Sequence, residues 1–280
     1  MTIRLLGPKD EAALEAFLSR HCDSSMFLRS NVRISGLVYR QAAFHGRYMA
    51  AFHGEAIVSV VAHAWNGVLL VQAPEQAADV ARAVVASSGR KVTGILGPRA
   101  HVVAAREALG LDDAPLQTQR DETLFGLDLA KLLVPKLQEA LEFRPLQPGD
   151  RATIIDWRVA YNIETFQGTD TPEALSAAGA WFDWLMADGT ARVATKGGEL
   201  LSLSPFSARL PDVVQLGGVF TPPALRRRHY ARAAIAASLL AARDSGVRRA
   251  VLFASNQDAI RAYDSLGFER TGEFGLVLFA

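Results

Sequence analysis

Three consecutive arginines and a histidine, residues 226–229, precede an apolar helical pattern in the C-terminal half of the chain. A strand pattern comes before them and breaks at Pro222 and Pro223, so we expect the arginines in the first turn of the helix. The first backbone N–H groups of a helix have no partner within it, and the helix dipole is positive there. Cations at this end cost about 0.3–1 kcal/mol each at exposed sites unless an anion is present. The junction therefore indicates a diphosphate site.

A second block, residues 254–268, has the sequence ASNQDAIRAYDSLGF. Together with residues 213–231, it resembles the GNAT superfamily of N-acetyltransferases, whose second signature is Asn…Ala…Tyr…Leu-Gly-Phe. The two blocks have the order and spacing of that family. The resemblance implies acetyl-CoA as the acyl donor, no metal ion, and direct attack on the thioester by a primary amine. The acceptor would be a small molecule, an amino acid or a protein N-terminus.

The resemblance also implies an opening in the sheet, between the strand before the arginine-rich helix and the strand after it. The pantetheine arm would lie there, hydrogen-bonded to the backbone of the first strand. Gly217 and Gly218 fit a bulge that bends this strand away, although a simple kink without a ligand is the alternative. The coenzyme-binding residues implied are Val219, Phe220, Thr221, Arg226, Arg227, Arg228, His229, Tyr230, Ala231 and Asn256.

The diphosphate loop departs from the family pattern Gln/Arg-x-x-Gly-x-Gly/Ala. Arg226 and Ala231 match its ends, but His229 replaces the glycine, and Arg227 stands where many relatives have another glycine. Glycine lets phosphate oxygens approach the backbone without a Cβ in the way. We expect a more open loop or a lower affinity, a helical φ at both replaced positions, and retained binding.

Acetyl transfer to an amine needs a neutral nucleophile, a stabilised oxyanion and a proton for the leaving thiolate. By resemblance, the backbone N–H near Val219–Phe220 polarises the thioester carbonyl, and Tyr263 protonates the sulfur. The alternative for Tyr263 is a core aromatic, because Ile260, Tyr263 and Leu266 have helical spacing. Asn256 could cap its helix, bind the pantetheine, or do both.

The general base is less clear than the acid. Many relatives have a glutamate on the strand before the arginine-rich helix, where this chain has Gln215. An amide cannot accept a proton at neutral pH, so Gln215 could only orient a water or the substrate. Glu164 is the best carboxylate candidate, with a solvent-exposed glutamate as the alternative. His229 is a poor base because a facing phosphate would keep it cationic.

The start of the chain recurs in its middle. Residues 3–10, IRLLGPKD, match residues 143–150, FRPLQPGD, at Arg, Leu, Pro and Asp. We predict two tandem copies of one fold, a GNAT-like domain at residues 1–138 and a catalytic domain at residues 142–280, joined in a charged helical stretch at residues 130–142. The first copy has acidic Glu75 and Asp79 at the corresponding helix start. These would repel a diphosphate, so this copy is degenerate and serves as a scaffold or substrate wall.

The predicted class is α/β (α+β), and each copy is a mixed, mostly antiparallel twisted sheet flanked by helices. The C-terminal copy would contain the splayed parallel strand pair. Its helices are expected at about residues 150–163, 172–187, 225–244 and 257–266. Its strands are expected at residues 191–195, 199–209, 213–220 and 250–254, with an antiparallel pair at 271–273 and 276–279.

Composition excludes several other classes. A net charge of +1 argues against a general nucleic-acid binder. The single cysteine, Cys22, excludes an internal disulfide and indicates a reducing compartment. No apolar signal core starts the chain, and the apolar segment 233–242 is too short to span a bilayer. We expect a cytoplasmic protein that acts off the membrane, as a monomer rather than a homodimer.

A second function remains open on the same residues. A non-catalytic acyl-CoA sensor would also need the arginine-rich loop. The lost loop glycine and the missing strand carboxylate both fit such a binding module.

Overall fold

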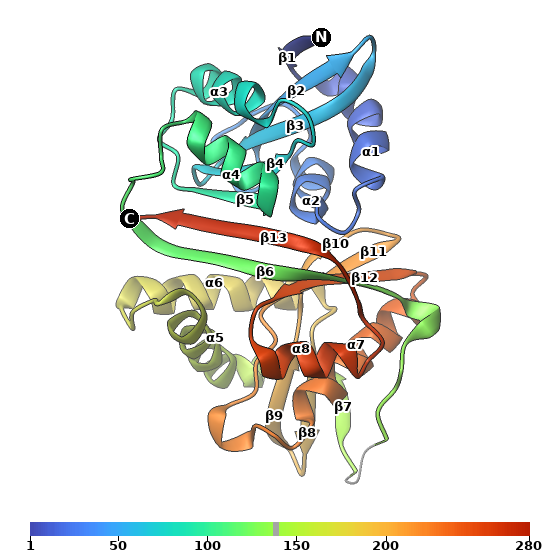
Figure 1. Ribbon diagram of the computed structural model, residues 1–280. Coiled ribbons are helices and arrows are strands. Elements are labelled where there is room, and N and C mark those ends of the chain that lie inside the picture. The colour runs from blue at the N-terminus through green and yellow to red at the C-terminus, as the bar shows by residue number, and fades with distance from the viewer. Residues whose placement is uncertain (137–139) are drawn as a thin grey trace. The chain divides into compact units, whose positions relative to one another are not determined.

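The computed structural model describes residues 1–136 and 140–280 (Figure 1), and residue 138, where the first copy is predicted to end, lies outside them. The chain divides into two compact units. Unit 1 comprises Met1–Leu124, Phe253–Ser255 and Arg270–Ala280. Unit 2 comprises Phe125–Leu252 and Asn256–Glu269. In the described part of the chain, no helix is both long and apolar enough to cross a membrane.

Unit 1 is a sheet with helices on both faces. Its strands run in the order β1-β2-β3-β4-β5-β13. They are β1 (Thr2–Leu5), β2 (Gly46–His53), β3 (Ala56–Ala64), β4 (Val68–Gln72), β5 (Gly94–Pro98) and β13 (Glu269–Phe279). The helices are α1 (Glu11–Ser19), α2 (Met26–Ser35), α3 (Ala77–Ser88) and α4 (Arg99–Ala108). Only β4 and β5 pair in parallel among these strands, within the described residues.

Alternating side chains of β2 divide the core of unit 1. Met49 and Ala51 pack in the cluster that contains Val80 of α3, whereas Tyr48 and Ala50 pack with the α1 side chains. Successive side chains of a strand point to opposite faces, so the sheet separates two apolar layers.

The C-terminal strand differs from the prediction. Residues 271–273 and 276–279 do not form an antiparallel pair, because β13 runs without interruption. Its residues 274–278 pair with residues 98–94 of β5, so the ladder continues through the expected turn. Gly275 is needed for packing instead, since a Cβ there would lie 3.2 Å from the Cβ of Val102.

Unit 2 contains two groups of strands and four α-helices. β7 (Glu142–Pro145), β8 (Arg192–Lys196) and β9 (Glu199–Ser204) form an antiparallel sheet. β11 (Val213–Leu216) pairs with β10 (Phe206–Arg209) antiparallel and with β12 (Arg249–Ala254) in parallel. The helices are α5 (Arg151–Phe166), α6 (Pro172–Asp188), α7 (Tyr230–Asp244) and α8 (Gln257–Asp264). The chain passes from unit 1 to unit 2 along β6 (Leu116–Asp128). The predicted α/β class with a mixed, mostly antiparallel sheet is confirmed.

The repeated sequence forms the same local structure twice. In unit 1, Arg4 donates to both Asp10 oxygens at 2.8 and 2.7 Å, and in unit 2 Arg144 donates to Asp150 at 2.7 and 2.8 Å. Each carboxylate also accepts a backbone N–H three residues earlier. The hydrogen bond from Arg4 lowers the pKa of Asp10 to about 2. Burial tends to raise the pKa of Asp150, but the bonds from Arg144 and the backbone outweigh it and the pKa is lowered.

The predicted helical stretch at residues 130–142 is wrong in its described part. Only a short 3-10 turn forms at Leu129–Lys131, and Glu142 starts β7. Pro135 cannot continue a helix. The N–H of Leu133 donates to the carbonyl of Leu266 at 3.0 Å, so tertiary contacts take up the backbone donors.

Candidate active site

The strand that leads into the arginine-rich loop is shorter than predicted. β11 pairs with β12 from Val213 to Gln215 and ends at Leu216. Gly218 then has a φ of +81°, and a Cβ on Gly217 would lie 2.6 Å from Ser207 Oγ. Both glycines are therefore required where the strand ends. The register irregularity lies between Phe206 and Ala208 of β10, rather than in the two glycines.

Beyond these glycines the backbone has free donors. Phe220 forms an isolated bridge with Leu203, in which its N–H donates at 3.1 Å and its C=O accepts at 2.9 Å. Because neighbours in an extended chain alternate, the N–H groups of Val219 and Thr221 point away from β9. Neither N–H has a partner within residues 1–136 and 140–280. Of the predicted pair Val219–Phe220, only Val219 has an N–H available to polarise a carbonyl.

The arginine-rich segment is a loop and not the first helical turn. After a 3-10 turn at Pro223–Leu225, α7 begins at Tyr230. The prediction of helical φ is wrong, since φ is +62° at Arg227 and +67° at His229. These are the two positions where the related proteins have glycine, which adopts such angles without strain. The loop backbone thus has the shape that glycine would allow.

The first turn of α7 offers unpaired donors to this loop. The earliest backbone bond of the helix start runs from Ala233 N–H to the carbonyl of His229 at 3.0 Å. The N–H groups of Tyr230 and Ala231 have no acceptor in the described part of the chain. Together with the strand N–H groups, they form the kind of donor set that holds an extended amide chain ending in a diphosphate. The residues present therefore fit coenzyme A.

The cationic side chains of the loop divide into two groups. Arg226 donates through Nε to the carbonyl of Thr221 at 2.9 Å and through Nη2 to Glu164 Oε2 at 2.7 Å. Arg227, Arg228 and His229 are exposed and have no hydrogen bond or ion pair among the residues that the structure describes. These three are available to an anion.

The two base candidates are both engaged. Glu164, near the end of α5, accepts from Arg226 with both carboxylate oxygens, at 3.0 and 2.7 Å. The buried amide of Gln215 donates through Nε2 to Ser207 Oγ at 2.9 Å. Glu164 thus anchors Arg226, and Gln215 joins β11 to β10. Their predicted catalytic roles stay predictions.

Tyr263 lies in a buried aromatic group. Its ring centroid is 6.2 Å from that of Phe125 and 5.7 Å from that of Phe268, and its side chain is buried. These contacts agree with the core alternative, and the acid role stays a prediction. Asn256 caps α8, because its Oδ1 accepts from the N–H of Asp258 at 2.8 Å.

Sequence reasoning missed a cation beside Gly218. The guanidinium of Arg158, on α5, lies 4.5 Å from the ring centroid of Trp181 and 5.3 Å from that of Tyr161. A Cβ on Gly218 would lie 3.4 Å from Arg158 Nη1. Trp157, next to it, contacts the ring of Phe220 with centroids 5.8 Å apart. The only local signal is the spacing of Arg158 and Tyr161, which places them on one helical face.

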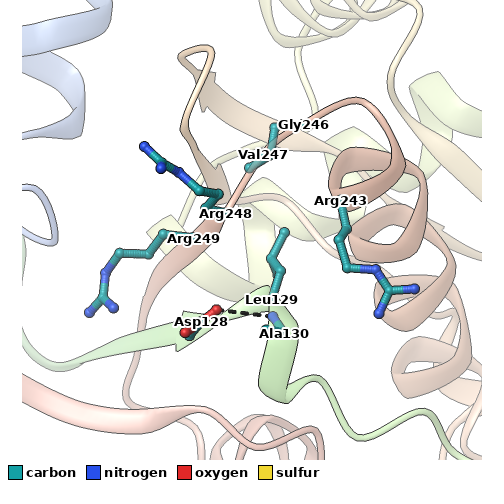
Figure 2. A pocket seen from close by; sticks show the side chains of 8 residues that line it. All are labelled: Asp128, Leu129, Ala130, Arg243, Gly246, Val247, Arg248 and Arg249. Atoms are coloured by element: carbon teal, nitrogen blue, oxygen red, sulfur yellow. Dashed lines mark hydrogen bonds between the residues drawn. The ribbon is translucent and has the colours of Figure 1, made fainter.

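A surface hollow lies at the far end of α7 (Figure 2). Its lining consists of Asp128, Leu129, Ala130, Arg243, Gly246, Val247, Arg248 and Arg249. The 15 residues of α7 place this end about 20 Å from the loop. In Figure 2, Arg248 and Arg249 extend away from Arg243, and the Asp128 carboxylate accepts from the N–H of Ala130 at 3.0 Å. None of the predicted site residues lines this hollow.

The corresponding strand end in unit 1 has its donors occupied. The N–H of Ala73 donates to His101 Nδ1 at 3.2 Å, and the N–H of Glu75 donates to Ser59 Oγ at 3.0 Å. A Cβ on Gly97 of β5 would lie 2.2 Å from the carbonyl oxygen of Val71, so the two strands approach closely there. Among the described residues, the N–H groups of Ala73 and Glu75 are thus occupied, unlike those of Val219 and Thr221.

Comparisons with known proteins identify the class. The model of the acetyltransferase (GNAT) family matches residues 152–268, a segment that includes α5 to α8. Residues 152–268 therefore form a GNAT acetyltransferase domain, as the sequence motifs predicted. No curated protein matches the chain.

Solved structures share the fold over almost the whole length. A GCN5-related N-acetyltransferase from Sphaerobacter thermophilus is 16% identical with a TM-score of 0.61, covering 99% of this chain and 94% of that chain. A Drosophila protein is 14% identical with a TM-score of 0.66, covering 99% and 98%. A tandem GNAT protein from the clavulanic acid biosynthesis pathway is 14% identical with a TM-score of 0.58, covering 100% and 98%. At these identities the similarity establishes the fold.

Proposed function

We propose that the protein is an acetyl-CoA-dependent N-acetyltransferase that acetylates a primary amine by direct attack on the thioester. The acceptor is a small molecule, an amino acid or a protein N-terminus. The proposal is carried by the backbone N–H groups of Val219, of Thr221 and of the first turn of α7, which have no acceptor among the described residues. Buried or partly buried backbone donors need partners, and a bound pantetheine would supply them.

The donor site follows from these groups. The C=O of Val219 and the N–H of Thr221 would hold the amides of the pantetheine arm, which leaves the N–H of Val219 for the thioester. The N–H groups of Tyr230 and Ala231, with the exposed side chains of Arg227 and Arg228, would hold the diphosphate. When bound, acetyl-CoA supplies an acetyl group activated as a thioester.

The remaining residues serve the transfer. The N–H of Val219 stabilises negative charge on the carbonyl oxygen, since the N–H of Phe220 is bonded to Leu203. The Tyr263 hydroxyl protonates the leaving thiolate. With Glu164 bonded to Arg226 and Gln215 to Ser207, the amine proton passes to water.

A coupled assay tests this function. Thiol release from acetyl-CoA is followed with a panel of primary amines, and mass spectrometry detects a product heavier by one acetyl group. We expect release that depends on the amine. Folded protein that gives no heat with acetyl-CoA or coenzyme A in calorimetry would refute the donor site.

A non-catalytic acyl-CoA sensor is the second candidate. It is favoured by one observation: Glu164 and Gln215, the two side chains considered as the base, both have protein partners. Tight binding of acetyl-CoA without turnover on any amine would support the sensor over the enzyme.

We also propose that residues 1–138 are a degenerate copy of the fold that serves as a scaffold or substrate wall. The matched ion pairs Arg4–Asp10 and Arg144–Asp150 support a duplicated origin. The proposal includes a monomeric, cytoplasmic protein that does not bind nucleic acid or membranes. Light scattering coupled to gel filtration tests the monomer, for which a mass near 30.2 kDa is expected.

A further inference from the structure

Arg158 is a partly buried cation that the proposed transfer does not yet use. It projects from α5 toward Trp181 of α6, with its guanidinium 4.5 Å from the ring centroid. Tyr161 lies one turn further along α5, with its ring centroid 5.3 Å from the same group. Gly218 approaches from the end of β11, since an added Cβ would lie 3.4 Å from Nη1. Aromatic rings and backbone thus surround the guanidinium without neutralising its charge.

Arg158 differs from the other arginines with limited exposure. Across residues 1–136 and 140–280, the structure gives it no hydrogen bond and no ion pair. Arg29 pairs with Glu15, Arg144 pairs with Asp150, and Arg192 donates to backbone carbonyls. Burial lowers the pKa of Arg158, partly offset by Tyr161. A partly buried cation whose N–H groups no protein group accepts is stabilised by an anion that pairs with it.

The place of Arg158 indicates which anion it meets. Gly218 directly precedes Val219, whose N–H is the proposed carbonyl donor, and adjacent Cα atoms are about 3.8 Å apart. An anion on Arg158 would therefore lie close to the reacting carbon. The diphosphate is assigned to the loop before α7, where exposed Arg227 and Arg228 have no partner in the part of the chain that the structure describes. The acceptor is the remaining reactant, and we assign it to the region beside Arg158.

We propose that Arg158 binds a carboxylate of the acceptor, and that the acceptors are amines that carry a carboxylate close to the nitrogen, as amino acids do. The inference rests on the proposed N-acetyltransferase function and specifies its substrate class. A guanidinium presents its N–H groups in a planar fork that matches both oxygens of a carboxylate. Arg226 is already engaged, because its Nη2 donates to both oxygens of Glu164 and its Nε donates to the carbonyl of Thr221.

The deciding experiment compares amino acids with their amides in the thiol-release assay. An amide lacks the carboxylate, but its amine also differs in basicity from that of the acid. The ratio of kcat/KM for the acid to kcat/KM for the amide is therefore compared between the native protein and Arg158→Gln. In Arg158→Gln this ratio should be roughly 10- to 100-fold lower than in the native protein, mainly through KM of the acid. A ratio that Arg158→Gln leaves unchanged overturns the inference.

Two further variants separate recognition from folding. Arg158→Lys keeps the charge without the fork and should give an intermediate ratio. Arg151→Gln is the matched control, since Arg151 lies on the same helix, stacks on Phe182 and pairs with Asp183. It should leave the ratio unchanged. An equal loss of the ratio in Arg151→Gln would assign the effect to the helix and overturn the inference.

A binding measurement keeps this test independent of turnover. With coenzyme A in place of acetyl-CoA, amino acids should change the tryptophan fluorescence, because Trp181 lies over Arg158. Amides should not change the fluorescence. The variant Arg158→Gln should lose the response to amino acids but keep the native Kd for coenzyme A in calorimetry. No turnover with any amine, together with this fluorescence response, would refute the proposed function and leave the carboxylate site. A response as large for amides as for acids would refute the site.

Discussion

Replacing His229 by glycine should stabilise the protein, which is unusual for a substitution that removes a side chain. His229 has a φ of +67°, a conformation that costs an L-residue about 1–2 kcal/mol relative to glycine. Glycine also gains freedom in the unfolded chain, which offsets about 0.5–1 kcal/mol. The net gain in the free energy of unfolding is about 0.5–1 kcal/mol over an L-residue at this position, whether histidine or alanine. This corresponds to a rise in Tm of about 1–4 °C.

The comparison with alanine isolates the backbone effect, since His229→Gly and His229→Ala both remove the imidazole. Arg228 is the matched control, because its φ is not positive. At that position the order should reverse, with Arg228→Gly less stable than Arg228→Ala by about 0.5–1 kcal/mol. Differential scanning calorimetry of the four variants measures the difference. Equal stability of His229→Gly and His229→Ala would show that the loop is not left-handed at this residue.

Three further changes test other parts of the structure. Tyr263→Phe should lower kcat without changing the Kd for coenzyme A, and an unchanged kcat at the optimal pH would remove Tyr263 from the acid role. Glu164→Gln should keep turnover and release Arg226 to bind coenzyme A. Because an exposed ion pair contributes at most about 1 kcal/mol, coenzyme A binding should tighten by up to about fivefold. A hundredfold loss of turnover would instead make Glu164 the base. Asp10→Asn should lower the free energy of unfolding at pH 7 by about 1–2 kcal/mol, since the pKa of Asp10 is about 2 in the folded protein. A lowered pKa stabilises above the ordinary value of 3.8, so the difference from the native protein should close as the pH falls from about 4 to about 2. A difference that keeps its pH 7 size down to pH 2 would contradict the role of this ion pair.

The helices of unit 2 could be predicted closely because their signals are local. Thr171 and Pro172 indicate the start of α6. The Thr171 hydroxyl accepts a hydrogen bond from the N–H of Ala174, as an N-cap does. The apolar run 250–254 became β12, paired in parallel with β11. In these segments the periodicity, the caps and the tertiary environment favour the same structure.

The start of α7 could not be predicted because the signal for a left-handed backbone was missing. Glycine would indicate a left-handed position, but this loop has Arg227 and His229 instead. Arginine and histidine are both compatible with a continuous helix. Tertiary structure overrides that preference in the loop.

The missed side-chain contacts join distant parts of the chain. Arg226 reaches Glu164 across 62 residues, and Gly218 meets Arg158 only through the packing of α5. No spacing rule relates such positions. The residues of the donor site were therefore predictable from their motif, and the partners that occupy or surround them were not.

The place of β13 constrains how the protein is made. This strand completes the sheet of unit 1 at β5, and its Val277 and Phe279 lie in the same core as Val80. Yet most of unit 2 lies between β5 and β13 in the sequence. Until β13 has been synthesised, β5 lacks this partner, and an unpaired strand edge can pair with other chains. The sheet of unit 1 is thus completed only after residues of unit 2 have been synthesised, and a fragment that stops at residue 136 lacks the strand that completes it.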